Sequence, residues 1–268
     1  MTEKILTIQD LSCVGECSLT VALPILSAFG FETAVLPTAI LSEHTLFRNY
    51  TFSDLTDNME KTLSSWEKDG HRFSAIYTGY LGAVGHFGIV EKIIERCAEP
   101  GVKIIVDPVF GDNGKLYPRF DEDYVSAVRK FVSLANVILP NMTEACFLLK
   151  RPYTESYTRE SVSSILRELS DMGGCDVVLT GFGENGKIGF ASYERAEKKT
   201  MFYLTERADG NFHGTGDIFA SVFTGAYLSG KNLYESAKKA TDFTKDAVFT
   251  TEKEHFYGVR FERILKNL

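Results

Sequence analysis

Residues 211–220 read Asn-Phe-His-Gly-Thr-Gly-Asp-Ile-Phe-Ala, and a glycine stands on either side of Thr215. Small and apolar residues follow at once and predict a helix. A glycine turn at a helix start presents successive backbone N–H groups, and the helix dipole there favours an anion. Asp217 falls in the first turn, where a carboxylate can take the proton of an attacking hydroxyl group. The stretch therefore predicts an anion hole with Asp217 as the catalytic base.

A plain helix cap is the simpler interpretation of residues 214–217. In that interpretation the side chain of Thr215 or Asp217 accepts hydrogen bonds from free N–H groups of the first turn and has no catalytic role. The four residues alone leave both interpretations open, so the rest of the chain has to decide between them.

Short apolar strands alternate with helix-length segments through most of the chain before this stretch. We predict strands at residues 4–9, 33–40, 74–78, 103–107, 136–139 and 176–180, and helices at 18–29, 53–68, 84–98, 121–134, 143–149 and 159–172. Alternation of this kind is typical of βαβ units in a mostly parallel sheet. Several strands are continuous apolar runs, which indicates that helices cover both faces.

The pattern changes after residue 181. Residues 187–192 and 200–205 predict two antiparallel strands, and residues 214–230 and 233–249 return to helix. No linker, internal repeat or low-complexity tract interrupts the chain. We therefore expect one α/β domain that spans residues 1–268.

Composition limits the function classes. The chain has 268 residues, 44% hydrophobic and 24% charged, and a net charge of −7 with no block of Lys and Arg. Binding of nucleic acid or of a membrane surface needs a concentrated positive field, so we expect neither. There is no signal-peptide pattern and no apolar run long enough to cross a membrane. With five cysteines, an odd number, these features favour a cytoplasmic protein with reduced thiols.

Polar residues gather where the predicted strands end. In an open α/β sheet, ligands bind beyond the carboxyl ends of the strands. The loops at these ends begin at Asp10, Ala39, Thr78, Asp107, Pro140 and Thr180. Asp107, Asp112 and Glu144 add carboxylates, which are the oxygen ligands that a hard cation such as Mg²⁺ takes. Strand-end and helix-cap roles are the alternative for these three side chains.

The order of several short motifs identifies a family. They are Ile8-Gln9, Ser42-Glu43-His44-Thr45, Thr78-Gly79-Tyr80, Asp107-Pro108-Val109-Phe110-Gly111-Asp112, Pro140-Asn141 with Glu144, and Val178-Leu179-Thr180. With Gly-Thr-Gly-Asp at 214–217 they resemble the pyridoxal, pyridoxine and pyridoxamine kinases of the ribokinase-like superfamily, from residue 5 to about residue 230. The resemblance implies a ribokinase-like three-layer α/β/α sandwich. It also implies ATP-dependent phosphorylation of the hydroxymethyl group of a B6 vitamer.

The resemblance further implies roles for single residues. Asp217 is expected to be the catalytic base, in an anion hole of Gly214, Thr215 and Gly216. The residues expected near ATP are Thr180, Asn141, Asp112, Thr215 and Gly216. Those expected to contact the vitamer are Asp10, His44, Thr45, Tyr80, Asp217 and Tyr117, the last in a flap over the site. The expected Mg²⁺ residues are Glu144, acting through water, and Asp107.

The family also implies accessory ligands and an assembly. ATP and Mg²⁺ are expected as cofactors, together with a monovalent cation such as K⁺. The partners expected are the small-molecule substrate and a second copy of the chain in a homodimer.

One position departs from the family. Asp10 follows Ile-Gln where many pyridoxal kinases have a serine that contacts the substrate ring. A carboxylate there would pair with a protonated pyridine nitrogen or an amine. It would equally indicate a shifted substrate, such as pyridoxamine or the aminopyrimidine of hydroxymethylpyrimidine kinases. Capping of the following turn is the alternative without a ligand.

Rival functions remain open. Hydroxymethylpyrimidine and sugar kinases share the chemistry, although the β-lid usual in sugar kinases has no counterpart near the N-terminus. A protein that senses vitamin or nucleotide without turnover would keep the fold but would not need Asp217.

Two further signals have simple explanations. Residues 181–186 match the dinucleotide pattern G-x-G-x-x-G, but a strand follows and Asn185-Gly186 is a hairpin signal, so we expect a turn. Cys13 and Cys17 lie near the Asp10 loop, where a thiol would add to an aldehyde or fill a small gap in the core.

Overall fold

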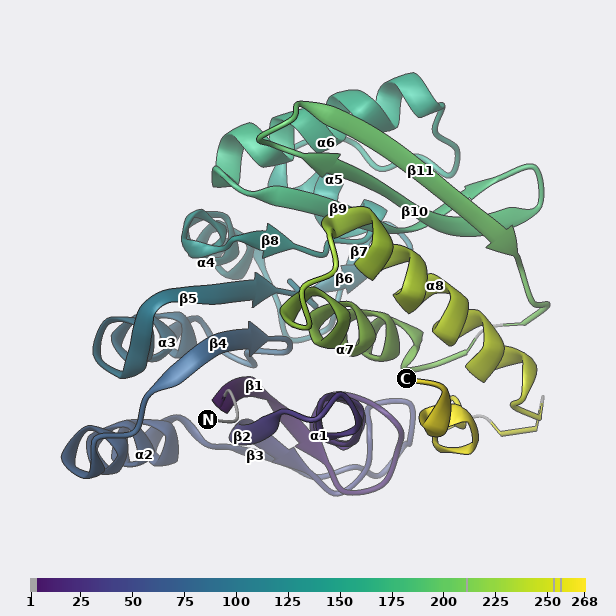
Figure 1. Cartoon of the computed structure of the whole chain (residues 1–268). Coiled ribbons are helices and arrows are strands. Elements are labelled where there is room, and N and C mark those ends of the chain that lie inside the picture. Colours follow the sequence, from purple (N-terminus) through teal and green to yellow (C-terminus); the bar gives the residue numbers. More distant parts are fainter. Residues whose placement is uncertain (1–3, 211, 253, 256) are drawn as a thin grey trace.

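A nine-stranded sheet forms the centre of the molecule (Figure 1). The computed structural model describes residues 4–210, 212–252, 254–255 and 257–268. Within these residues the strand order is β11-β10-β9-β8-β5-β4-β1-β2-β3. The strands are β1 (Lys4–Ser12), β2 (Glu32–Leu41), β3 (Phe52–Asp54), β4 (Phe73–Thr78), β5 (Ala98–Val106), β8 (Val137–Ile138), β9 (Asp176–Glu184), β10 (Lys187–Glu194) and β11 (Lys199–Glu206).

Helices occupy most of the connections between the strands. They are α1 (Leu19–Ala28), α2 (Thr56–Asp69), α3 (Val84–Cys97), α4 (Glu122–Phe131), α5 (Met142–Leu148), α6 (Arg159–Gly173), α7 (Thr215–Leu228) and α8 (Leu233–Phe249), with 3₁₀ turns η1 (Val132–Leu134) and η2 (Phe261–Asn267). A separate ribbon, β6 (Gly111–Asp112) and β7 (Lys115–Leu116), follows β5. None of the helices described is both long and apolar enough for a membrane crossing.

Parallel pairing dominates the sheet and confirms the predicted fold class. The pairs β2/β1, β1/β4, β4/β5, β5/β8 and β8/β9 are parallel. At one edge β10 and β11 continue the sheet antiparallel, which confirms the strand pair predicted after residue 181, and at the other edge β3 pairs antiparallel with β2. Crossover helices between the parallel strands produce this arrangement.

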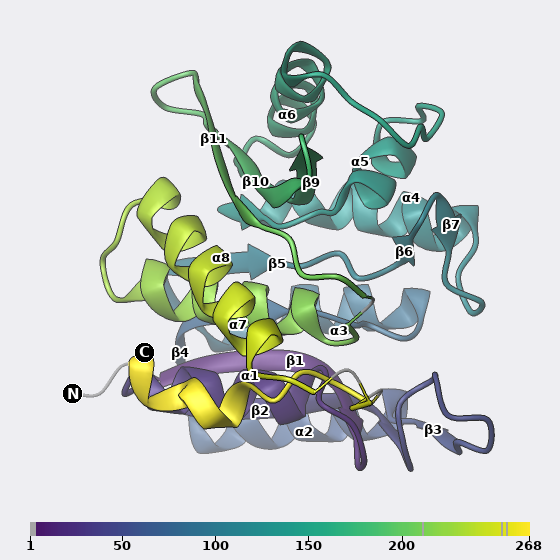
Figure 2. The same cartoon turned by 90° about the vertical axis from the view of Figure 1, so that its right-hand side faces the viewer.

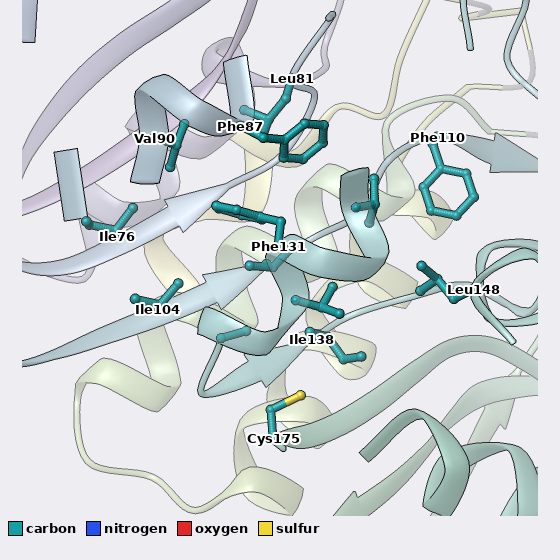
Figure 3. Packing of buried hydrophobic residues seen from close by; sticks show 14 of the residues in the cluster. Ile76, Leu81, Phe87, Val90, Ile104, Phe110, Phe131, Ile138, Leu148 and Cys175 are labelled. Atoms are coloured by element: carbon teal, nitrogen blue, oxygen red, sulfur yellow. The ribbon is translucent and has the colours of Figure 1, made fainter. Parts of the chain in front are cut away.

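Helices lie on both faces of the sheet and make three layers (Figure 2). A separate hydrophobic cluster fills the space between the sheet and the helices on each face. Alternate residues of β4 show the division, because Tyr77 belongs to the cluster with α1, α7 and α8, whereas Ile76 belongs to the cluster with α2 to α6. In the second cluster Phe131 of α4 lies near Phe87 of α3, with ring centroids 5.3 Å apart (Figure 3). Truncation of such a buried ring to alanine typically costs about 3–5 kcal/mol of stability, so this cluster holds the helices to the sheet.

The structure departs from the prediction in short elements. The helix predicted from residue 53 begins at Thr56, because residues 52–54 form the edge strand β3 and Asp54 accepts a hydrogen bond from the N–H of Thr56. Strands β1 and β9 run past the expected ends, to Ser12 and Glu184, so Asp10 and Thr180 are strand residues rather than the first residues of loops. Two- and three-residue strands have too little periodicity to be seen in a sequence.

Candidate active site

The carboxyl ends of the parallel strands meet the N-terminus of α7. In Figure 1 the arrowheads of β4, β5 and β8 point toward the side where the β6–β7 ribbon lies. In addition to burial, Asp10 near the end of β1 raises the pKa of Asp217 in α7, and Asp217 in turn raises the pKa of Asp107 after β5, so these carboxylates lie near one another. The structure thus brings together carboxylates that are far apart in the sequence, at the edge where ligands of such sheets bind.

The start of α7 depends on the first glycine of the motif. Gly214 is the N-cap, buried, with φ of 81°, and a Cβ there would lie 2.1 Å from the carbonyl oxygen of Glu16. The N–H of Ile218 donates to the carbonyl of Gly214 at 3.0 Å. The N–H groups of Thr215, Gly216 and Asp217 precede this first helical bond, so the helix itself offers them no acceptor. Gly216 is exposed, which leaves its N–H open to an anion.

Asp217 is partly buried in the first turn of α7. Burial, reinforced by the negative charge of Asp10, raises the pKa of its carboxyl group to about 7, although the backbone N–H of Ser18 opposes the shift. A carboxylate with a pKa near the working pH is suited to general base catalysis. The sequence motif predicts the position of this group, but the pKa follows from its surroundings.

Asp10 is almost fully buried, with 6% of its surface exposed. It lies at an irregularity in the β1–β2 register between Gln9 and Leu11, and such bulges re-aim side chains next to active sites. The hydroxyl of Ser12 donates to Asp10 Oδ2 at 3.2 Å. Burial raises the pKa of Asp10, and the hydroxyls of Ser18 and Ser12 lower it. Among the described residues no cationic side chain forms an ion pair with this carboxylate.

Glu144 and Asn141 form a capping box at the start of α5. Both carboxylate oxygens of Glu144 accept backbone N–H groups at 2.9 Å, from Phe110 and from Asn141. The amide of Asn141 accepts from Glu144 N at 3.0 Å and donates to the carbonyl of Gly111 at 2.8 Å. These two side chains therefore tie the loop after β5 to α5, and the helix-cap interpretation of Glu144 is confirmed.

Thr180 lies within β9 beside this box. Its N–H donates to the carbonyl of Pro140 at 2.9 Å, and it forms a parallel bridge with Asn141. This pairing fixes Thr180 next to the start of α5, where the phosphate residues of the resemblance are expected to converge.

Residues 110–117 form a hairpin beside the site. β6 and β7 enclose the turn Asn113-Gly114, where both φ angles are positive, at 52° and 73°. Asp112 accepts from the N–H and side chain of Asn113, so it faces its own turn. At the end of the hairpin, burial and then Glu144 and the nearby aspartates raise the pKa of Tyr117, so its hydroxyl lies near these acidic side chains.

The residues expected to contact the vitamer differ in how far they are buried. Burial raises the pKa of Tyr80 to about 12, with Arg119 opposing and Asp10 adding to the rise, so Tyr80 lies near Asp10. Thr45 is exposed. His44 is buried, accepts from Leu46 N at Nδ1 (3.2 Å) and therefore donates from Nε2 to the carbonyl of Tyr257 (3.1 Å). Both nitrogens of His44 thus hold protein groups together, and no ring nitrogen is left for a substrate.

Comparison with known proteins bears on the family of the chain. The family model described as phosphomethylpyrimidine kinase matches residues 26–258. A curated pyridoxal kinase from Dictyostelium discoideum is 30% identical over 241 residues, 84% of this chain and 78% of that protein. The crystal structure of pyridoxal kinase from Lactobacillus plantarum is 31% identical, with a TM-score of 0.92 over 100% of this chain and 96% of the other. The chain belongs to the pyridoxal kinase family.

A second solved relative in this comparison bears on the ligand. A Bacteroides thetaiotaomicron protein, solved in a crystal form with pyridoxal, is 38% identical with a TM-score of 0.94, over 100% of this chain and 96% of that one. The overlap confirms the ribokinase-like three-layer fold that the motifs imply for this pyridoxal kinase family member.

Ser18 is a residue of the candidate site that the sequence analysis missed. It precedes α1 with φ of 51°, and its side chain does not cap that helix. Its hydroxyl instead lowers the pKa of Asp10 and its N–H lowers the pKa of Asp217, so it joins the two carboxylates. A non-glycine residue with positive φ is uncommon and points to a site. No sequence pattern signals such a backbone angle at a serine.

The structure also bears on the G-x-G-x-x-G string and on the two cysteines near Asp10. Residues 184–187 form a two-residue hairpin, with Asn185 and Gly186 at φ of 51° and 74°, which confirms the turn expected at the G-x-G-x-x-G string. Both cysteines of interest are free thiols; Cys13 is exposed and Cys17 is buried. Burial and the charges of Asp217 and Asp10 raise the pKa of Cys17, so this thiol is a poor nucleophile.

The carboxylates suit a Mg²⁺ that is bound mainly by phosphate and water. No three His, Cys, Asp or Glu side chains within the described ranges form a metal-binding group. Mg²⁺ in kinases needs only one or two carboxylates beside the substrate phosphates. Burial and the charge of Glu144 raise the pKa of Asp107, so these two groups lie together and favour a cation. Glu144, with both oxygens already accepting N–H groups, would act through water.

Proposed function

We propose that this protein transfers the γ-phosphoryl group of ATP to the hydroxymethyl group of a B6 vitamer. The observation that supports the proposal best is Asp217, a carboxylate with its pKa raised to about 7, in the first turn of a helix whose leading N–H groups have no helical acceptor. Base and anion hole are therefore adjacent, as in-line phosphoryl transfer requires.

In this proposal, different residues have separate roles in the reaction. Asp217 takes the proton of the hydroxymethyl group as the oxygen forms a bond to the γ-phosphorus. The bond between that phosphorus and the bridging oxygen of ADP breaks. The N–H groups of Thr215 and Gly216 stabilise the charge on the phosphoryl oxygens. Mg²⁺, when bound, neutralises phosphate charge.

We assign the nucleotide phosphates to the region around α5 and β9. Thr180 pairs with Asn141 there and Asp112 lies near Glu144, and we propose that Asp107 and Glu144 would supply negative charge for Mg²⁺. Tyr117, on the hairpin, would cover the phosphates from the solvent side. The closed hairpin would then exclude water, which would otherwise compete with the vitamer for the phosphoryl group.

The vitamer is assigned to the opposite end of the site, near Asp10 and Tyr80. The buried carboxylate of Asp10, without an ion-pair partner among the described residues, fits a protonated ring nitrogen or an amine. Thr45, on the exposed loop beside buried His44, completes the pocket as we propose it. The pyridoxal in the crystal of the Bacteroides relative supports this choice of substrate class.

Hydroxymethylpyrimidine is the second candidate substrate, because the matching family model has the name phosphomethylpyrimidine kinase. The curated hydroxymethylpyrimidine/phosphomethylpyrimidine kinase of Aquifex aeolicus is a more distant relative, 24% identical over 65% of this chain. The vitamin is therefore the better-supported substrate.

A substrate panel tests the proposal. Purified protein with MgATP is assayed for ADP release with pyridoxal, pyridoxine, pyridoxamine, hydroxymethylpyrimidine and ribose, beside the variant Asp217→Asn. We expect turnover of a B6 vitamer and a loss of about 100-fold or more in the variant, the usual contribution of a general base. Turnover of the pyrimidine alone would reassign the substrate, and ligand binding without turnover would favour a sensor.

Five further features stay predictions. They are the homodimer, the single domain over residues 1–268, the requirement for Mg²⁺, stimulation by K⁺ and a cytoplasmic location. The sheet supports the single domain, since it joins strands from β1 to β11 and α7 and α8 close over it.

A further inference from the structure

Three polar side chains lie on one face of α7. Asp217, Ser221 and Thr224 are spaced four and three residues apart, which puts them in line along a helix. Ser221 and Thr224 are fully buried, at 0% exposure. The other residues between Asp217 and Thr224 are apolar, and two of them, Ile218 and Val222, belong to the core cluster. A hydroxyl stripe that runs from the catalytic carboxylate into the core has no role in the reaction described above.

Several strand residues that face this stripe are also buried and polar. Thr7 and Gln9 follow Ile5 at alternate positions of β1, so they point to the α7 face, and Tyr77 of β4 belongs to the cluster on that face. Thr7 and Gln9 are fully buried and Tyr77 is 2% exposed. Gly79 makes room for this arrangement, because a Cβ there would lie 2.8 Å from the amide of Gln9. We call Gln9, Tyr77, Ser221 and Thr224 the polar seam.

Four polar atoms of the seam are buried without a hydrogen-bond partner in the described part of the chain: Gln9 Oε1, the Tyr77 hydroxyl, Ser221 Oγ and Thr224 Oγ1. The other end of the Gln9 amide donates to Thr7 Oγ1 at 2.9 Å. Each unsatisfied buried group costs about 1–3 kcal/mol, and a whole domain is stable by only about 5–15 kcal/mol. Atoms of this kind are normally satisfied by internal water.

Tyr77 connects the seam to the acidic site. Burial and the negative charges of Asp107 and Asp217 raise the pKa of its hydroxyl, while Ser221 and Gln9 lower it. The two seam side chains are thus near the Tyr77 hydroxyl, yet neither makes a hydrogen bond of ordinary geometry with it. Buried polar atoms that lie near one hydroxyl and have no partner are groups that an internal water can satisfy.

We propose that the polar seam binds internal water, held by Tyr77, Gln9 and Ser221, and that this hydrated seam positions the catalytic carboxylate of Asp217. The four side chains are neutral and include both donors and acceptors, which suits water better than a cation. Tyr77 and Ser221 are positioning residues, since they act through Asp217. The second half of the proposal rests on the function proposed above.

A crystal structure that resolves ordered solvent tests the binding of water without any assay. We expect a water molecule within hydrogen-bond distance of the Tyr77 hydroxyl and of Gln9 Oε1 or Ser221 Oγ. Direct side-chain hydrogen bonds with no water between them would overturn the proposal, as would a coordinated metal ion in the seam. This result stands whether or not the protein phosphorylates a vitamer.

Removal of single hydroxyls tests the positioning role. We expect Tyr77→Phe and Ser221→Ala each to lower kcat about tenfold, the value of one hydrogen bond to a charged group, with KM for vitamer and ATP unchanged. The matched control is Ser192→Ala, because Ser192 also has a buried, unpartnered hydroxyl but lies on β10. The control should retain wild-type kcat.

The same changes in an Asp217→Asn background separate positioning from general structural damage. If the seam acts through Asp217, Tyr77→Phe and Ser221→Ala have no further effect on the residual rate. A tenfold loss that persists without the carboxylate, or a rise in KM with kcat intact, overturns the proposal. Should Tyr77→Phe not fold, Ser221→Ala decides the result. Absence of turnover in the wild-type protein would count against the proposed function and leave the crystallographic test in force.

Discussion

At the scale of single residues, the site depends on two carboxylates that differ in what surrounds them. Asp217 is only partly buried in the first turn of α7, whereas Asp10 lies in strand β1 and has 6% of its surface exposed. The charge of Asp10 adds to the burial that raises the pKa of Asp217. A cationic substrate group that neutralises Asp10 would therefore make Asp217 a carboxylate at lower pH, so binding would favour the reactive state of the base.

Replacement of Asp10 by the serine common in the family tests this coupling. We expect Asp10→Ser to move the acidic limb of the kcat/KM profile to lower pH, because the charge that raises the pKa of Asp217 is removed. We also expect the KM for pyridoxamine to rise more than the KM for pyridoxine, since pyridoxamine carries an additional amine. Equal changes for both vitamers would show that Asp10 does not contact the amine.

A side chain at position 214 would clash with the backbone of Glu16. We expect Gly214→Ala to lower kcat about 100-fold, because a Cβ at 2.1 Å from Glu16 O forces a shift of the anion hole, and a misplacement of about 1 Å has that effect. Gly101→Ala is the matched control, since Gly101 has the same φ of 81° but no atom within 4 Å of its Cβ. The control should lose some stability and keep its kcat, measured by thermal unfolding and steady-state kinetics.

At the scale of elements, the chain uses one motif for two purposes. Asn141 with Glu144 and Asn232 with Glu235 both form complete capping boxes, at the starts of α5 and α8. The box of α8 is exposed, with Glu235 N donating to Asn232 at 2.9 Å. That of α5 is buried and also holds the loop after β5. The capping box of α5 therefore makes a tertiary contact in addition to its local hydrogen bonds.

This difference predicts different effects for the same substitution. Asn232→Ala should cost about 1 kcal/mol of stability, the usual value of an N-cap, with kcat and KM for ATP unchanged. Asn141→Ala should cost more stability and raise the KM for ATP, because the carbonyl of Gly111 and the loop beside Thr180 lose their support. Chemical denaturation and ATP titration measure both. Equal behaviour of the two variants would remove Asn141 from the nucleotide site.

At the scale of the whole molecule, the sheet concentrates buried acids at one edge. The folded pKa values of Asp10, Asp107, Glu144 and Asp217 are raised, those of Glu144 and Asp217 to about 7. The folded state binds protons more tightly at these groups than the unfolded chain does. For Glu144 and Asp217 this contribution to stability is complete below about pH 4 and is lost as the pH rises through about 7.

The variant Asp217→Asn isolates one part of this dependence. It should match the wild-type stability below about pH 4, where the carboxyl group is protonated in both states. From there to about pH 7 it should become progressively more stable than wild type, because the variant has no charge to bury. Difference curves of denaturant unfolding against pH remove the opposing effect of His213, whose pKa burial lowers to about 4. A pH-independent difference would contradict the raised pKa.

Local patterns account for most of the fold that the sequence predicts. The parallel strands and the helices between them have their own periodicity, and the hairpin at Asn185-Gly186 has its own turn signal. The hairpin at Asn113-Gly114 carries the same signal but was not predicted, because its strands have only two residues each. The extension of β1 through Asp10 was missed because pairing with β2, a non-local contact, decides where the strand ends.

The sequence alone determined the family and the order of the longer strands and helices, and it predicted Asp217 as the candidate base, since each follows from residues adjacent in the chain. The tertiary structure alone decided that Ser18 joins Asp10 to Asp217, that Glu144 caps α5 with both oxygens, and that the seam around Tyr77 is polar. Burial and charge proximity cause these features. Both depend on which distant segments meet, and a sequence pattern does not contain that information.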